Sequence, residues 1–225
     1  MVPDLERRAR KYIFDYFYEN ARAPVLEEIM KNFRLDREQG HKLLKDLEAA
    51  HHIAILPGTQ RILMANPFSG ITTPFVDKIR GRSYFANCAW DTVSMHVMAD
   101  QDTSVESYCH HCAAPIRISL SRGKMVKAQP GNPLIFLSVP IAHWYDNLIN
   151  TCSNNMVYFA SEEHQKEWLD HHPSLHGETL TVDMMGQVCQ PLSRGRLDLG
   201  FTRPSPDKLM AYWSSLGLHG DYWKI

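Results

Sequence analysis

The chain has 225 residues, of which 44% are hydrophobic and 22% charged, as in an average globular protein, so disorder is excluded. Its 24 basic and 25 acidic residues give a formal net charge of −1, and this balance lacks the basic surplus that binding to a phosphate backbone requires. No apolar run approaches the roughly 18 residues of a membrane-spanning helix, and the first 20 residues are charged throughout, so we expect neither a membrane segment nor a signal peptide.

The amino-terminal 49 residues contain three helical patterns. Residues 4–20 place apolar side chains at helical spacing and predict an amphipathic helix. Pro24 is suited to the first turn of a second helix that ends near Phe33. Asp36 and Gln39 have the spacing of a capping box and predict the start of a third helix.

Two short apolar runs, 52–56 and 61–65, follow the third helix and predict two strands joined by a tight turn at Pro57-Gly58-Thr59. Three helices and a hairpin form a winged-helix-like unit, to which we assign residues 1–66. The third helix of such units often reads DNA. Here its basic side chains alternate with acidic ones, which is typical of a solvated face and makes DNA binding a minor alternative.

Residues 67–82 contain prolines and glycines without a sustained period and are interpreted as a linker. A second domain is expected over residues 83–225. Helical patterns in it cover 89–98, 161–170 and 181–190, and strand-like runs cover 105–109, 116–120, 124–128, 134–139 and 156–160. The prediction is an α+β fold with a mixed or antiparallel sheet and flanking helices. The aromatic tail with Trp213, Tyr222 and Trp223 is expected to pack on the body or on a partner.

Cys88 and Asp91 lie where a short strand is predicted to give way to a helix. The positive end of a helix dipole favours a thiolate, and a residue three positions later lies on the same helix face. The pair therefore combines a soft nucleophile with a proton carrier. The alternative from the residues alone is a small buried cysteine and an ordinary first-turn acid.

Cys109 and Cys112 form a Cys-x-x-Cys pair that carries His110 and His111 inside it. Such a pair is a usual half of a structural zinc site, but the chain has no second pair to complete four ligands. Three interpretations remain open, namely metal ligands, a redox pair and packing thiols. We keep both cysteines as candidate metal ligands.

Cys152 stands among small polar residues directly before the strand-like run 156–160, at a position suited to reach a cleft. The alternative is an ordinary loop cysteine. Cys189 lies among apolar residues at helical spacing and is expected to pack in the core. The five cysteines are an odd set without an export signal, so free thiols in a reducing, cytoplasmic compartment are favoured over disulfides.

With these motifs in order, the chain resembles the alkylmercury (organomercurial) lyases. The resemblance extends over roughly residues 10–195 and includes the amino-terminal helical unit. The motifs that carry the resemblance are Cys88-Ala89-Trp90-Asp91, Cys112-Ala113-Ala114-Pro115, Thr151-Cys152-Ser153, Tyr158-Phe159-Ala160-Ser161-Glu162-Glu163-His164 and Trp168. In the family, the second cysteine falls one residue nearer the strand, where this chain has Ser153, and a one-residue shift restores Cys152.

The resemblance implies a catalytic trio of Cys88, Cys152 and Asp91. It also implies cleavage of a carbon–mercury bond by protonolysis, without an organic cofactor and with external thiol for product release. Thiolates are natural ligands of a soft ion such as Hg(II), and a carboxyl group can carry the proton to carbon. Partners are then small organometallic or other small molecules. The alternatives are a lyase with a different substrate, and a thiol-rich protein that binds or senses soft metals without turnover.

Overall fold

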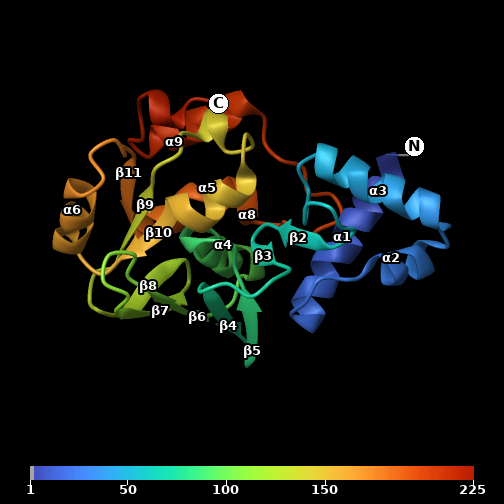
Figure 1. The fold of residues 1–225 in the computed structure, drawn as a ribbon, viewed down its shortest axis with the longest axis horizontal. Coiled ribbons are helices and arrows are strands. Elements are labelled where there is room, and N and C mark those ends of the chain that lie inside the picture. Colours follow the sequence, from blue (N-terminus) through green and yellow to red (C-terminus); the bar gives the residue numbers. More distant parts are fainter. Residues whose placement is uncertain (1–2) are drawn as a thin grey trace.

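The computed structural model describes residues 3–225, and its first part is a helical unit followed by a small sheet (Figure 1). Asp36 caps the third helix through its carboxylate, which accepts the Gln39 N–H at 2.8 Å, so the predicted capping box is confirmed. The helices are α1 (Pro3–Asn20), α2 (Leu26–Phe33) and α3 (Arg37–Ala49). The antiparallel sheet contains β1 (Ala54–Ile55), β2 (Ile62–Ala65) and β3 (Phe68–Ser69).

The segment 67–82, interpreted from sequence as a linker, contains regular structure. Strand β3 pairs with β2, and β4 (Val76–Ile79) pairs with strands on both of its sides. Four-residue strands are too short to show a period, because only pairing with neighbours selects their conformation. The segment is therefore part of two sheets rather than a free connection.

The larger sheet has five antiparallel strands in the order β5-β4-β6-β7-β8. In β7 alternate side chains are buried, so one face of this sheet is turned to the core. Besides β4, its members are β5 (Arg82–Phe85), β6 (Thr103–Tyr108), β7 (Pro115–Ser121) and β8 (Lys124–Gln129).

A second antiparallel sheet of three strands has the order β10-β9-β11. Every residue of β9 and β10 is buried, as expected for strands covered on both faces. Its members are β9 (Leu134–Leu137), β10 (Met156–Phe159) and β11 (Glu178–Thr181). The α+β prediction is confirmed, and all strand pairs among the described residues are antiparallel.

Helix α4 (Ala89–Ala99) is the central element, and it contacts β4 of one sheet and β10 of the other. All residues from Ala89 to Met98 are buried, which fits a helix that is apolar on most of its surface. Figure 1 shows it in the middle of the molecule, behind α5. The site described below is built at the start of this helix.

The remaining helices cover the second sheet and close the chain. The predicted helix over 181–190 is divided into two short helices at Cys189. The elements are η1 (Ile141–His143), α5 (Leu148–Asn155), α6 (Glu162–Asp170), α7 (Val182–Val188), α8 (Gln190–Ser193), α9 (Pro206–Ser215) and η2 (Asp221–Trp223).

The aromatic tail packs on the body, which decides between the two alternatives left by the sequence. The Trp213 indole N–H donates to the Val188 carbonyl at 3.0 Å, and its ring lies 5.6 Å from that of Trp223. The helical unit is also joined to the larger sheet, because the Tyr84 hydroxyl of β5 donates to the Tyr18 carbonyl of α1 at 2.7 Å. Within residues 3–225, no helix combines the length and apolarity needed to cross a membrane.

Candidate functional site

Cys88 occupies the position immediately before α4, between the end of β5 and the first helical turn. Its backbone is extended, with φ −162° and ψ 179°, and its carbonyl accepts the Thr92 N–H at 3.2 Å. The predicted strand-to-helix transition at this residue is confirmed. The Cys88 side chain is 1% exposed, and its sulfur lies 3.6 Å from the Met156 sulfur of β10.

Asp91 lies one helical turn after Cys88 and is held by a side chain that the sequence analysis did not single out. The Asn87 amide donates to Asp91 Oδ2 at 2.9 Å and to the carbonyls of Pro67 and Phe68 at 3.3 and 3.1 Å. Asn87 therefore fixes the carboxylate relative to β3. In the sequence, only its position directly before Cys88 indicated a role for Asn87 in the site.

Cys152 lies within α5, a helix directly before β10 that the sequence analysis did not predict. Helix α5 begins after Asn147, whose side-chain oxygen accepts the Asn150 N–H at 3.1 Å. In this helix Cys152 is 2% exposed, whereas the next residue, Ser153, is exposed. Helical phase therefore turns the Cys152 sulfur inward, where the Asn66 amide lies 3.9 Å from it.

The structure brings Cys88, Asp91 and Cys152 together. The two sulfurs and one carboxylate oxygen all lie within 4.8 Å of one another, and all three residues are buried. If a thiolate–metal bond is about 2.3 Å long, as for zinc, two thiolates on opposite sides of one ion lie about 4.6 Å apart. The spacing suits one soft metal ion held between the two sulfurs.

Burial dominates the electrostatics of this trio. It raises the pKa of Cys88 well above its ordinary value, and the hydrogen bond with Cys152 and the charge of Asp91 add to that shift. Burial likewise raises the pKa of Asp91 to about 6, although the Asn87 hydrogen bond and the charge of Arg196 act in the opposite direction. Burial therefore opposes the expected stabilisation of a Cys88 thiolate at the helix end, and the pKa of this thiol is raised.

A second carboxyl group, Asp77 of β4, is buried completely in the neighbourhood of Asp91. Its pKa is raised well above the ordinary value by burial first and by the charge of Asp91 second. Among residues 3–225, neither of its carboxyl oxygens has a hydrogen-bond partner. Both observations indicate a carboxyl group that the fold keeps protonated.

The trio lines a cavity of about 300 Å³. Apolar side chains, including Trp90 and Trp144, form most of its wall, and these two rings meet edge to face at 5.0 Å. At its exposed end, His51 stacks on Tyr145 at 4.0 Å and the Arg203 guanidinium lies 5.4 Å from the same ring. The cavity thus has an apolar interior that contains two thiols, and a polar, partly cationic mouth. Neither these mouth residues nor Arg196 carried any local signal in the sequence.

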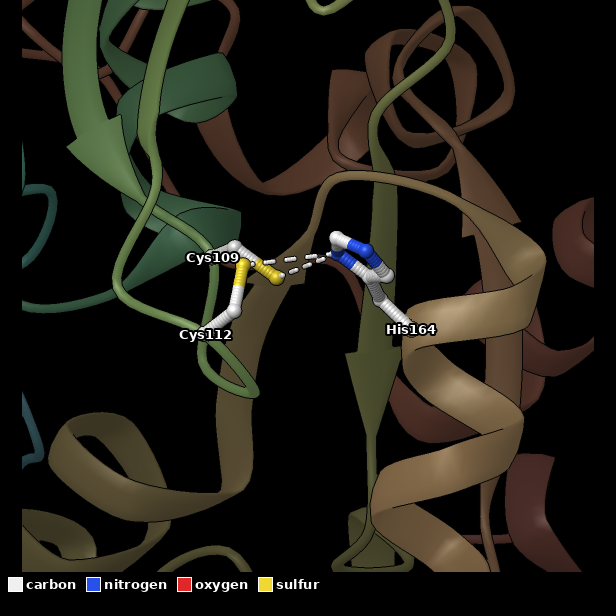
Figure 2. Close-up of side chains that lie close together, drawn as sticks. All are labelled: Cys109, Cys112 and His164. Carbon is white, nitrogen blue, oxygen red and sulfur yellow. Dashed lines mark hydrogen bonds between the residues drawn. The ribbon is translucent and has the colours of Figure 1, made fainter.

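Neither Cys109 nor Cys112 is among the described residues that line this cavity. The two cysteines belong to a separate cluster with His164. Figure 2 shows both sulfurs directed at one nitrogen of His164, which comes from α6. Each sulfur lies 3.5 Å from His164 Nδ1.

Cys189 is buried, and its sulfur donates to the Gly186 carbonyl at 3.7 Å. Burial raises the pKa of this thiol to about 12, as expected of a packing cysteine.

The fold has a close counterpart among solved structures. It superimposes on the structure described as "Crystal structure of the mercury-bound form of MerB2" with a TM-score of 0.70 and 22% sequence identity. The alignment covers 88% of this chain and 93% of that one. This chain therefore has the same α+β fold as that protein, which is itself described as mercury-bound.

The sequence model of the alkylmercury lyase family, MerB, matches residues 68–193, more than half of the chain. The protein belongs to the alkylmercury lyase family. Curated alkylmercury lyases of Bacillus cereus and Clostridium butyricum are each 26% identical over 113 residues, which make up 50% of this chain and 50% of theirs. The alkylmercury lyase of Streptomyces lividans is 25% identical over 132 residues, 57% of this chain and 60% of that protein. These matches thus span about half the length of the curated relatives.

Proposed function

We propose that this protein cleaves the carbon–mercury bond of organomercurials by protonolysis, with Cys88, Cys152 and Asp91 as its catalytic residues. The observation that carries the proposal is the approach of two buried sulfurs and a carboxylate to within 4.8 Å of one another. Membership of the alkylmercury lyase family supports it as well. Mercury enters as part of the substrate, and the proposed chemistry needs no organic cofactor.

The first step is capture of the organomercurial cation, R–Hg⁺, by one thiol. Mercury is soft and displaces a thiol proton, so a Cys–S–Hg–R adduct forms even where the pKa of the free thiol is raised. The apolar wall with Trp90 and Trp144 receives the hydrocarbon group. The cavity of about 300 Å³ limits the size of that group.

The second step is proton transfer. The second thiol binds the mercury and gives its proton to Asp91, whose pKa of about 6 suits a group that both accepts and donates. Asp91 then protonates the carbon, and the electron pair of the carbon–mercury bond forms the new carbon–hydrogen bond. The balance is R–Hg⁺ plus two Cys–SH giving R–H, Cys–S–Hg–S–Cys and one H⁺. External thiol then removes the Hg(II).

The decisive experiment incubates the purified protein with an arylmercury salt and excess thiol and measures the released arene. We expect turnover by the unaltered chain and none by Cys88→Ser or Cys152→Ser, because either leaves mercury with one protein thiolate. Ser153→Ala is the matched control, since Ser153 neighbours Cys152 but is exposed, and it should turn over normally.

Three other outcomes would contradict the proposal. Tight Hg(II) binding without arene release would favour the soft-metal-binding or sensing function. Release of arene that requires Ser153 rather than Cys152 would show that Cys152 is not the second mercury ligand. A lyase acting on another substrate would bind the mercurial in the same cavity but release no hydrocarbon at a rate above the thiol-only reaction.

A further inference from the structure

We propose that Cys109, Cys112 and His164 bind one Zn²⁺ ion, at a site separate from the mercury-binding cavity. The ligand atoms are two sulfurs and the imidazole Nδ1, all within 4.8 Å of one another. The proposal does not depend on lyase activity, because it concerns other residues and is measured as bound metal.

The distances fit tetrahedral zinc. With zinc–sulfur bonds of about 2.3 Å and zinc–nitrogen bonds of about 2.05 Å, a tetrahedral ion holds sulfur and nitrogen about 3.5 Å apart. Both observed distances from sulfur to His164 Nδ1 are 3.5 Å. One ion bound by the three atoms is therefore compatible with both of these distances and with two sulfurs that lie within 4.8 Å of each other.

Hydrogen bonding alone explains this arrangement less well. Nδ1 of a neutral imidazole either donates one proton or offers one lone pair, so it can satisfy only one of two thiols placed at equal distances. A shared cation satisfies both sulfurs and the nitrogen together. Figure 2 shows the two sulfurs side by side, facing the nitrogen from the loop between β6 and β7.

The backbone around Cys109 is already arranged as in a zinc knuckle. The Ala113 N–H donates to the Cys109 carbonyl at 2.8 Å, and Ala113 adopts a left-handed φ of 58°, which turns the loop back so that both sulfurs point the same way. The Ala160 N–H, from the end of β10, lies 3.3 Å from the Cys109 sulfur. Such N–H groups orient a thiolate ligand and spread its charge.

The surroundings provide access and a fourth position. Cys112 is exposed, so an ion can enter from solvent and keep a water molecule as its fourth ligand. The neighbouring His111 is engaged elsewhere, because its Nε2 lies 3.1 Å from a Glu167 carboxylate oxygen. The ion would tie the β6–β7 loop to α6, two segments more than 50 residues apart in sequence.

The test measures metal in the full chain, reduced and handled without oxygen. After metal removal and reloading with Zn²⁺ or Co²⁺, we expect one ion per chain after desalting. Co²⁺ should give the intense visible bands of a tetrahedral site and a thiolate charge-transfer band. Cys112→Ser and His164→Ala should weaken binding at least about 100-fold, since each removes a ligand from a three-residue set.

Two control variants make the result specific. His171→Ala alters an exposed histidine after the same helix and should keep the ion. Cys88→Ser should also keep it, because that thiol belongs to the other cluster. Circular dichroism of each variant checks that loss of metal is not loss of fold.

Three results would overturn the proposal: a reduced chain that binds no Zn²⁺ or Co²⁺, binding unaffected by His164→Ala, or binding lost with Cys88→Ser. A Cys109–Cys112 disulfide in the purified protein, together with no metal uptake after reduction, would instead establish a redox pair.

Discussion

The two thiol clusters of this protein use the same element, sulfur, in different environments. Cys88 and Cys152 lie in the interior beside carboxyl groups, and burial raises the pKa of Cys88 well above its ordinary value. Burial also acts to raise the pKa of Cys109, but hydrogen bonds from the backbone of Ala160 and Cys112, together with His164, outweigh it, and that pKa is lowered.

The difference separates two kinds of metal chemistry. A thiol that stays protonated until a soft ion arrives gives up its proton on binding, and next to Asp91 that proton becomes available for reaction. A thiol whose pKa is lowered by backbone N–H groups gives up its proton more readily and is the better resident ligand. The cluster of Cys88 and Cys152 therefore suits turnover, and the cluster of Cys109 and Cys112, which is open to solvent at Cys112, suits a resident ion.

The largest expected effect is loss of one thiol from the buried cluster. Cys88→Ser or Cys152→Ser should reduce arene release to the rate of the thiol-only reaction, because serine does not bind mercury as a soft ligand. Cys112→Ser should retain turnover. If Cys112→Ser instead abolished arene release while Cys88→Ser did not, the cluster of Cys109 and Cys112 would be the site of cleavage.

Asp91→Asn should separate capture from cleavage within the buried cluster. We expect the mercurial to bind with little change and arene release to slow about 10²- to 10⁴-fold, the usual cost of a lost acid–base group. Single-turnover kinetics with bound mercurial measure the two steps separately. Equal loss of binding and cleavage would make Asp91 a structural residue.

Removal of the ion from the cluster of Cys109, Cys112 and His164 should lower thermal stability. An ion at 100 times its dissociation constant stabilises the folded state by about 2.7 kcal/mol. For a chain of this length, that corresponds to a fall in Tm of roughly 5–10 °C on adding a chelator. His164→Ala should already have the lower Tm and respond to chelator no further. A chelator effect of equal size in this variant would place the stabilising ion elsewhere.

A smaller effect concerns the pH dependence of stability around Asp77. Its pKa is raised in the folded protein, so the native state keeps a proton that the unfolded chain releases above the ordinary value of 3.8. The stabilisation is complete below that value and is lost as pH rises toward the folded pKa, by at most about 1.4 kcal/mol per pH unit. Asp77→Asn stays neutral, so its unfolding free energy should fall less steeply with pH in urea titrations. An unchanged slope would mean that Asp77 is ionised in the fold.

Local patterns determined much of the architecture. The capping box at Asp36 and the strand-to-helix transition at Cys88 depend on neighbours within four residues, and the structure has both. The spacing of Cys88 and Asp91 likewise fixed their shared helix face. The division into domains and the cytoplasmic location stay predictions.

Other features depend on pairing between distant segments, for which the sequence has no local signal. Strand β4 is selected by its two partners in the sheet, so the turn-rich segment interpreted as a linker gave no sign of this strand. Cys152 was expected directly before a strand, at a position suited to reach a cleft. The helix α5 that turns it inward was not predicted, because it is only eight residues long and a helix of that length is stable only when packed.

The chemistry of both clusters was decided by tertiary structure. His164 meets Cys109 and Cys112 across 55 and 52 residues of chain, beyond the range of any spacing rule. Whether a thiol pKa rises or falls depends on burial and on which N–H groups face the sulfur. The sequence by itself thus determined which residues carry sulfur and carboxylate chemistry and where the main helices begin. Only the packing of distant elements decided which residues share a site, because burial and distance are properties of the folded chain.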